Sequence, residues 1–172
     1  YDISILHNFW HTLGKRTPNP NSNGRIDIIG NVTYNLLNQL MRTGGSIQLN
    51  EIGNNYNVGG NHKLNVENGW VPQIYTSNNR YNNVITENGQ DNTIMWDNWL
   101  GGRDPLPSDF VSTPFPLLNY TIPLPDGDDS LLKVQNRELG CNGYLDNSGA
   151  YVFDIDDLDE EAYSQFDNGE YF

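Results

Sequence analysis

Four stretches in the first half of the chain share one pattern and decide the fold: ISILHNFWHT (3–12), IDIIGNVTYN (26–35), IQLNEIGNNYN (47–57) and PQIYTSNNRYN (72–82). Each begins with apolar residues that alternate with polar ones, reaches an Asn, and has an aromatic residue one to three positions later. Alternation with a period of two is typical of β-strands. A repeat length in the low twenties is typical of solenoids, in which each repeat packs only against its neighbours.

The Asn residues of these repeats are evenly spaced. Asn8, Asn31, Asn54 and Asn78 are separated by 23, 23 and 24 residues. No helix-length amphipathic stretch lies between the repeats, which argues against leucine-rich and helical repeats. We therefore predict an all-β fold, a parallel β-helix of about four coils stacked roughly 4.8 Å apart. The Asn amides are expected to hydrogen-bond from coil to coil in one column, and the aromatic residues to stack in a second column.

Charge and composition limit the classes of partner. The net charge of −13 argues against nucleic acid, which is bound by clustered Lys and Arg. No run of 18 apolar residues is present, so we predict no membrane span. His7, His11 and His62 have no partners at metal-ligand spacing, so no metal site is predicted in this chain. A calcium loop at 154–161 is an alternative to a solvated acidic helix start, but this stretch lacks the glycine and spacing of an EF-hand.

The sequence predicts three segments. Residues 1–96 hold the β-helix coils. Residues 97–127 contain six of the nine prolines, which exclude a central strand and predict an extended segment wrapped along the solenoid. Trp96 and Trp99 lie at its start, where they would stack on sugar rings if exposed or cover the solenoid if buried, and we expect burial. Residues 128–172 are expected to form short helices and an acidic tail beside the solenoid.

One or two short helices are predicted in the last segment. The first is capped by residues 128–130, runs through Leu139 and ends at Gly140. The second begins at Asp156 or Asp157 and stops at Gly169. The apolar stripe of this second helix is expected to consist of Leu158, Ala162 and Phe166.

A loop with two adjacent cations connects the first two repeats. Residues 14–24 read GKRTPNPNSNG, with Lys15 and Arg16 side by side. Pro18 and Pro20 restrict the backbone of this loop. A stiff loop that projects from a solenoid would hold both cations in place for an acidic ligand, and the structural alternative for Arg16 is a salt bridge that anchors the loop.

The stretch ILHNFWHTLGKRTPNPNSNGRIDIIGNVTYN (5–35) resembles the signature of the pectate lyase family, polysaccharide lyase family 1. That signature runs His-His-Asn-aromatic, then Arg-X-Pro, then Gly-Arg-aliphatic and a ladder Asn. The matching residues are His7, Asn8, Phe9, Trp10, Arg16, Thr17, Pro18, Gly24, Arg25, Ile26, Ile28 and Asn31. The resemblance implies a right-handed parallel β-helix in a secreted, extracellular protein.

The resemblance also implies Ca²⁺-dependent β-elimination of polygalacturonate-type acidic polysaccharide. Arg16 takes the role of the base, and we predict Lys15, Arg25 and His7 as substrate-binding residues. Because a free guanidinium has a pKa above about 12, this role requires Ca²⁺ or other cations nearby.

The calcium ligands and substrate lysine of the family lie in coils that come before the motif. We therefore expect this chain to be the C-terminal half of a longer protein and to be inactive alone. Two positions differ from the signature: Leu6 replaces the first His, and Asn21 stands where many members have a second Arg.

Two further expectations concern modification and partners. Asn31 and Asn119 stand in sequons and are candidate glycosylation sites of a secreted protein, although Asn31 is also a predicted ladder residue. The partners expected beside acidic polysaccharide are the N-terminal half of the same protein or copies stacked end to end. The alternative function is a non-catalytic structural or carbohydrate-binding subunit of an extracellular filament, sheath or spike, because open β-helix ends can pair with another chain.

Overall fold

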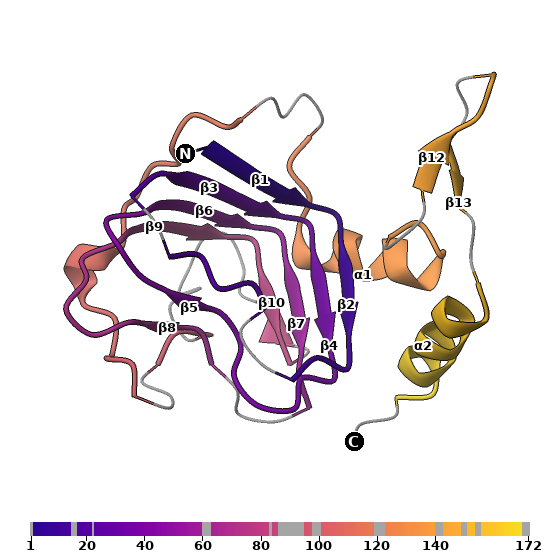
Figure 1. Cartoon of the computed structure of the whole chain (residues 1–172), viewed down its shortest axis with the longest axis horizontal. Helices are drawn as coiled ribbons and strands as arrows, with labels where there is room; N and C mark the ends of the chain where they lie inside the picture. The colour runs from indigo at the N-terminus through magenta and orange to yellow at the C-terminus, as the bar shows by residue number, and fades with distance from the viewer. Residues whose placement is uncertain are drawn as a thin grey trace.

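The computed structural model describes residues 2–14, 17–21, 23–59, 63–82, 84–85, 95–97, 101–118, 123–139, 143–148, 151–153 and 156–169. These residues form a β-solenoid of about three turns, with two helices at one side (Figure 1). The prediction of a parallel β-helix is confirmed. None of the helices in the described part is long and apolar enough to cross a membrane.

Two parallel sheets form adjacent sides of the solenoid. The first contains β1 (Asp2–Leu6), β3 (Arg25–Ile29), β6 (Gln48–Ile52) and β9 (Gln73–Ser77), in that order. The second contains β2 (Phe9–His11), β4 (Val32–Tyr34), β7 (Asn55–Asn57) and β10 (Arg80–Tyr81), and β11 (Val84–Ile85) pairs antiparallel with β10. A third side holds the short strands β5 (Arg42–Thr43) and β8 (Asn65–Val66).

The strand register reproduces the sequence repeat. Arg25 pairs with Gln48, 23 residues later, whereas Gln48 pairs with Gln73, 25 residues later. The last coil is therefore two residues longer than the one before it. Within the coils, Ile26 and Ile28 alternate with Asp27 and point into the solenoid, as the period of two requires.

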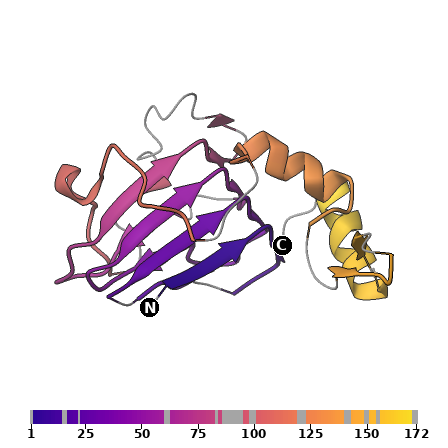
Figure 2. The same ribbon diagram turned by 90° about the horizontal axis from the view of Figure 1, so that it is seen from above.

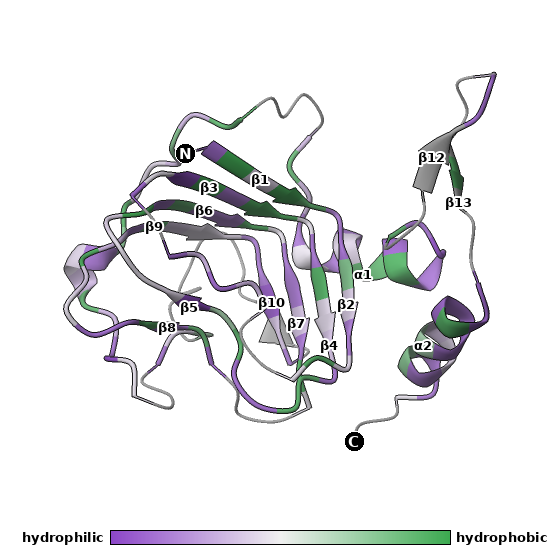
Figure 3. Cartoon of the chain, in the orientation of Figure 1, coloured by the Kyte–Doolittle hydropathy of each residue, from purple (hydrophilic) through white to green (hydrophobic). Residues whose placement is uncertain are grey.

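The core lies inside the coils and is almost fully excluded from solvent. Buried apolar residues come from all three sides, and the strands carry hydrophobic and hydrophilic positions in alternation (Figure 3). The largest fully buried core side chains include Ile28, Leu40, Met41, Ile47, Leu49, Tyr56, Leu64 and Ile74. Met95 and Trp96 close the core after the last coil, and Trp96 is only 5% exposed. The predicted burial of Trp96 is confirmed, and Trp99 lies outside the described residues.

The corner between the first and second sheets requires a left-handed backbone. His7, Gly30, Gly53 and Asn78 all have a φ between 53° and 66° at this position. Gly30 and Gly53 adopt this conformation without a steric penalty. A Cβ at Gly53 would also lie 2.1 Å from the carbonyl oxygen of Pro125, so glycine is the residue that fits there.

The residue after each corner forms the predicted ladder. Asn8, Asn31 and Asn54 each donate from Nδ2 to Oδ1 of the next ladder residue, over 2.9 to 3.0 Å. We call the column of Asn8, Asn31, Asn54 and Asn79 the amide ladder. Its last member is Asn79, so the prediction of Asn78 is wrong, because the longer last coil places Asn78 at the left-handed corner instead.

The aromatic residues do not form the single column that the sequence predicted. Tyr34 follows Asn31 by three positions and lies on the outer face, where it stacks on His11 at a centroid distance of 5.6 Å. Tyr56 follows Asn54 by two positions and lies inside the core. A shift of one residue along a strand moves a side chain to the other face, so the two tyrosines separate.

The proline-rich segment lies across the outer face of the first sheet. We call residues 101–118 the strap. Val111 N–H donates to the carbonyl oxygen of Ile74, Phe115 N–H to Asn50 Oδ1, and Leu118 N–H to Asp27 Oδ2. The strap therefore crosses β9, β6 and β3 in turn, as the sequence predicted for a wrapping segment.

Two helices cover the outer face of the second sheet. They are α1 (Gly127–Gln135) and α2 (Asp157–Asp167), and both lie at the same side of the solenoid (Figure 2). A hairpin of β12 (Gly143–Leu145) and β13 (Tyr151–Phe153) connects them in the sequence. Asp126 and Asp156 cap the two helices by accepting hydrogen bonds from backbone N–H groups of the first turn. The helices bury an apolar cluster against the solenoid that contains Val32, Tyr34, Val134, Leu139, Tyr163 and Phe166.

The helix predictions are correct in place and partly wrong in detail. The helix α1 is capped by Asp126 rather than by residues 128–130, and it ends at Gln135 rather than at Leu139. In α2 the buried residues are Tyr163 and Phe166, whereas Leu158 is 74% exposed. Leu158 lies in the first turn of α2, and the cluster contacts the later turns.

Candidate functional site

Among the predicted site residues that the structure describes, Arg25 and His7 lie apart. Lys15, Arg16 and Asn119 lie outside the described residues, so their predicted roles stay predictions. Arg25 begins β3, and His7 lies at the corner beyond its other end, where His7 N–H donates to the carbonyl oxygen of Ile29. A strand of five residues spans about 16 Å, so Arg25 and His7 lie at opposite ends of the first sheet.

His7 belongs to the packing of the corner. Its ring lies against Gly30, where a Cβ would come within 2.6 Å of Nδ1. Burial lowers the pKa of His7, the nearby cation Lys133 lowers it further, and a hydrogen bond with the Gly30 backbone opposes the shift. The His7 ring therefore packs at the corner, and its lowered pKa disfavours the charged form that would attract a uronate.

The loop before β3 packs along the third side of the solenoid. Thr17 and Pro20 are buried, and Asn21 forms a β-bridge with Gly44. Asn21 Nδ2 also donates to Glu67 Oε2 over 3.0 Å. The predicted projection of the loop is therefore wrong for residues 17–21, because backbone and side-chain hydrogen bonds hold them to the neighbouring coils.

Arg25 lies in a polar groove of about 420 Å³ at the beginning of the first sheet. The groove is lined by Asp2, Asn23, Gly24, Arg25, Ser46, Gln48 and Gln73. We call this surface the Arg25 groove. Gln48 Nε2 donates to Gln73 Oε1 over 3.4 Å, and Ser46 N–H donates to Asn23 Oδ1 over 3.1 Å. Side chains of successive coils thus stand side by side in two rows, in the same register as the strands.

The positive charge of Arg25 in the groove is only partly neutralised by a nearby carboxylate. Arg25 Nη2 and Asp2 Oδ2 are 3.7 Å apart, and the Asp2 side chain is 61% exposed. An exposed ion pair at this distance contributes little stability and is open to exchange with another anion. A guanidinium beside amides and a hydroxyl can bind a carboxylate and sugar hydroxyl groups together.

Most groove residues were not predicted as site residues. Asp2, Gln48 and Gln73 occupy the same strand position as Arg25 on their own coils. The signal was present in the sequence, because each is a polar residue directly before the first apolar residue of its strand. These positions align only when the strand register is considered together with the Asn spacing.

Asn31 is a ladder residue and has no exposed surface. Its Nδ2 donates to Asn54 Oδ1 over 3.0 Å and lies within hydrogen-bonding distance of the Ile5 and Ile29 carbonyl oxygens. A glycan on this nitrogen would break the ladder, so the predicted glycosylation at Asn31 is wrong for the folded chain.

The described residues do not fit a calcium site. They contain no group of three or more His, Cys, Asp or Glu side chains arranged to hold a metal ion. In the part of the 154–161 stretch that is described, Asp156 accepts hydrogen bonds from Leu158 and Asp159 N–H groups, as a helix cap does. The calcium that the resemblance implies therefore has no ligand set in this part of the chain.

A buried carboxyl group lies inside the coil stack. Glu51 on β6 is completely buried, and the Thr76 hydroxyl donates to its Oε2 over 2.5 Å. Burial raises the pKa of Glu51 to about 7, while Thr76, Tyr56 and Trp96, which face the carboxyl group, oppose the shift. Because Glu51 has no exposed surface and does not line the Arg25 groove, it is a core residue.

Comparisons of this chain with known proteins do not assign it to a family. No family model, no curated protein and no solved structure matches the chain. The assignment of function therefore depends on the fold, the Arg25 groove and the sequence motif.

Proposed function

We propose that this chain is the C-terminal part of an extracellular, pectate-lyase-like protein and that its Arg25 groove binds acidic polysaccharide. The observation that carries the proposal is the arrangement of the motif on the coils. Residues 7–10 and 24–31 of the motif lie on adjacent coils of a parallel β-helix, with Asn8 and Asn31 in the amide ladder and Arg25 in an open polar groove.

The groove matches the chemistry of a uronan chain. Uronates present carboxylates and hydroxyl groups at regular intervals along an extended polymer. Rows of Asn, Ser and Gln side chains repeat with the coils, and Arg25 supplies the positive charge. Arg is suited to this role because its planar guanidinium can donate two parallel hydrogen bonds to one carboxylate.

The expected role of the chain by itself is binding without turnover. The proposed base, Arg16, acts in the family only with calcium, and the described residues lack a calcium site. Catalysis would require ligands from outside the described part of the chain.

A binding measurement tests the groove. We expect oligogalacturonate to bind the chain by isothermal titration calorimetry, and Arg25→Gln to weaken this binding about tenfold. Arg137→Gln is the matched control, because Arg137 is a cation on the far, helical side that pairs with Asp167. Equal affinity for oligogalacturonate and a neutral oligogalactan of the same length, or no effect of Arg25→Gln, would overturn the proposal.

A second measurement tests the catalytic ancestry. A longer protein that carries this chain after further coils should release unsaturated uronate products in the presence of Ca²⁺. Arg16→Ala should abolish this ultraviolet absorbance, while Arg25→Gln should mainly raise KM. A protein that is folded, binds Ca²⁺ and cleaves no uronan would exclude the lyase role.

The second candidate function is a structural β-helix subunit. The observation in its favour is the difference between the two ends of the coil stack. Among the described residues nothing pairs with the outer edge of β1, and Ile3 on it is 44% exposed, whereas β11 and Trp96 cover the opposite end. An unpaired parallel edge is a template for another strand. Concentration-dependent association in light scattering, removed by Ile3→Lys, would favour this function.

A further inference from the structure

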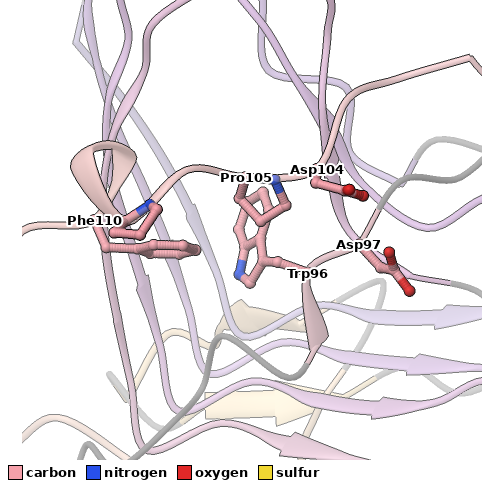
Figure 4. A pocket seen from close by; sticks show the side chains of 6 residues that line it. Trp96, Asp97, Asp104, Pro105 and Phe110 are labelled. Atoms are coloured by element: carbon pink, nitrogen blue, oxygen red, sulfur yellow. The ribbon is translucent and has the colours of Figure 1, made fainter.

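A second cleft lies between the end of the last coil and the strap. It has a volume of about 450 Å³ and is lined by Trp96, Asp97, Asp104, Pro105, Pro107 and Phe110 (Figure 4). Trp96 is placed by its β-bridge to Leu64, and Phe110 by its β-bridge to Ile74. The volume is within the range of small-molecule sites, roughly 300–1,000 Å³.

Rigid apolar groups form one wall of this cleft. The rings of Trp96 and Phe110 meet edge to face, with centroids 6.1 Å apart and an interplanar angle of 80°. Pro105 and Phe110 line the same cleft as Trp96 (Figure 4). Aromatic and proline rings lose little conformational entropy when a ligand packs on them.

The strap is fixed where it forms the cleft. Arg103 donates to both carboxylate oxygens of Asp109, over 2.7 and 2.9 Å, and Asp109 is completely buried. The Leu106 N–H also donates to Asp109 Oδ2, over 2.6 Å. These bonds tie both ends of the 103–109 segment together, so the cleft is formed before any ligand arrives.

The polar groups of the cleft accept hydrogen bonds and carry negative charge. Asp97 and Asp104 are both exposed at its mouth, and their side chains stand on the same side of Trp96 in Figure 4. A carboxylate has lone pairs for several donors, so each can accept from a ligand as well as from the protein. The charge near Asp97 is partly offset by Lys63. Burial lowers the pKa of Lys63, and the nearby Asp97 carboxylate opposes that shift.

We propose that this cleft is a binding site for a neutral pyranose. The C–H face of the sugar would pack on Phe110 and the two prolines, and its hydroxyl groups would donate to Asp97 and Asp104. Like charge repels a uronate from the same place. This preference is opposite to that of the Arg25 groove, so the proposal does not rest on the function proposed for that groove.

The experiment is an NMR titration of the ¹⁵N-labelled chain with two matched sugars. Galactose and galacturonate differ only at C6, where one has a hydroxymethyl group and the other a carboxylate. We expect galactose to shift the amide resonances of Phe110 and Asp104, and galacturonate to require at least tenfold higher concentration. Equal or tighter binding of galacturonate, galactose shifts that map elsewhere, or no shifts up to about 100 mM galactose would overturn the proposal.

Two variants test the charged part and the apolar part of the cleft independently. Asp104→Asn should reduce the tenfold preference for galactose over galacturonate to below about threefold, and Asp157→Asn on α2 is the matched control. Phe110→Leu keeps an apolar side chain but removes the ring, and should weaken galactose binding about fivefold while the remaining amide spectrum stays unchanged. A propylammonium titration that shifts the same amides at lower concentration than galactose would show a cation site instead and overturn the proposal.

Discussion

Two columns of polar side chains run along the coil stack, and their hydrogen-bonding partners come from different places. The amide ladder bonds from each coil to the next, so each Asn lies 23 to 25 residues from its partner in the ladder. The second column, Ser4, Asp27 and Asn50, points out of the first sheet and bonds to the strap. We call it the outer column. Its strap partners lie 65 residues from Asn50 and 91 residues from Asp27.

The comparison shows two ways to bury polar groups in a solenoid. In the amide ladder the repeat satisfies itself, because an identical side chain stands on the next coil. In the outer column the polar side chains alternate with Ile and Leu, as on a solvated face, yet Asp27 and Asn50 are completely buried. The strap backbone supplies hydrogen-bonding partners to both in place of water, and Asn50 Nδ2 also donates to Asp27 Oδ1 within the column.

The largest effect is expected in the amide ladder. Asn54→Ala removes the side-chain acceptor of Asn31 N–H and of Asn31 Nδ2, and it removes the side-chain donor to Asn79 Oδ1. Each buried group left unsatisfied costs about 1–3 kcal/mol, so we expect a loss of roughly 3–5 kcal/mol in the free energy of unfolding. Chemical denaturation measures it. Asn38→Ala, which truncates an exposed Asn, is the control, and an equal loss in both variants would contradict the ladder.

The next effect concerns Glu51, a buried polar side chain in neither column. Its pKa of about 7 in the folded chain lies above the ordinary value of 4.5, so the folded state holds a proton that the unfolded state releases. The protonated Glu51 side chain therefore contributes to the free energy of unfolding. This contribution is fully present below pH 4.5 and is lost as the pH rises through 7. At about 1.36 kcal/mol per pKa unit, the loss is roughly 3 kcal/mol.

Denaturation between pH 4.5 and 8 checks this prediction. The difference in unfolding free energy between Glu51→Gln and the unaltered chain should grow in favour of Glu51→Gln as the pH rises. Glu138→Gln neutralises an exposed carboxylate and serves as the control. A difference that stays constant across this window would show that Glu51 titrates normally.

A smaller, local effect is expected in the outer column. Asn50→Ala removes the acceptor of Phe115 N–H and the donor to Asp27. Because the coils keep their own ladder, we expect roughly 1–2 kcal/mol of destabilisation confined to the strap. Hydrogen exchange followed by mass spectrometry should show faster exchange in peptides covering 110–118. Exchange that rises equally in β3 and β6 would indicate that strap and coils unfold together.

The smallest effect on stability is expected at the exposed polar row of the groove. Arg25→Gln removes a long ion pair with the exposed Asp2 side chain, which contributes less than about 0.5 kcal/mol. The melting temperature of Arg25→Gln should therefore be nearly unchanged, although we expect its oligogalacturonate binding to weaken about tenfold. A large drop in melting temperature would mean that Arg25 has a structural role, and the binding loss could not then be assigned to the groove.

Whether a polar column could be predicted from the sequence depended on whether its partners follow the period of the coils. The amide ladder was visible because a repeated residue and its partner follow one period. The error at Asn78 arose because the last coil is two residues longer and carries two consecutive Asn residues, of which the second enters the ladder. The burial of Asp27 and Asn50 was not visible, because the strap that covers them has no period that matches the coils.

The candidate site was predicted less well, for a related reason. The motif placed Arg25 and His7 together by their likeness to a signature, but a strand of five residues separates them. The Arg25 groove arises from side chains that are neighbours only after the coils have stacked. The cleft at Trp96 and Phe110 likewise depends on where the strap returns to the last coil, which no local pattern encodes.

A double-mutant cycle on Asn31 and Asn54 tests most directly whether the amide ladder holds the coils together. The two side chains share one hydrogen bond of 3.0 Å inside the stack. We predict that Asn31→Ala and Asn54→Ala together cost at least about 1 kcal/mol less than the sum of the single variants, because the first substitution already breaks the bond. Unfolding free energies that add within about 0.3 kcal/mol would show that the two amides act independently and would contradict the account.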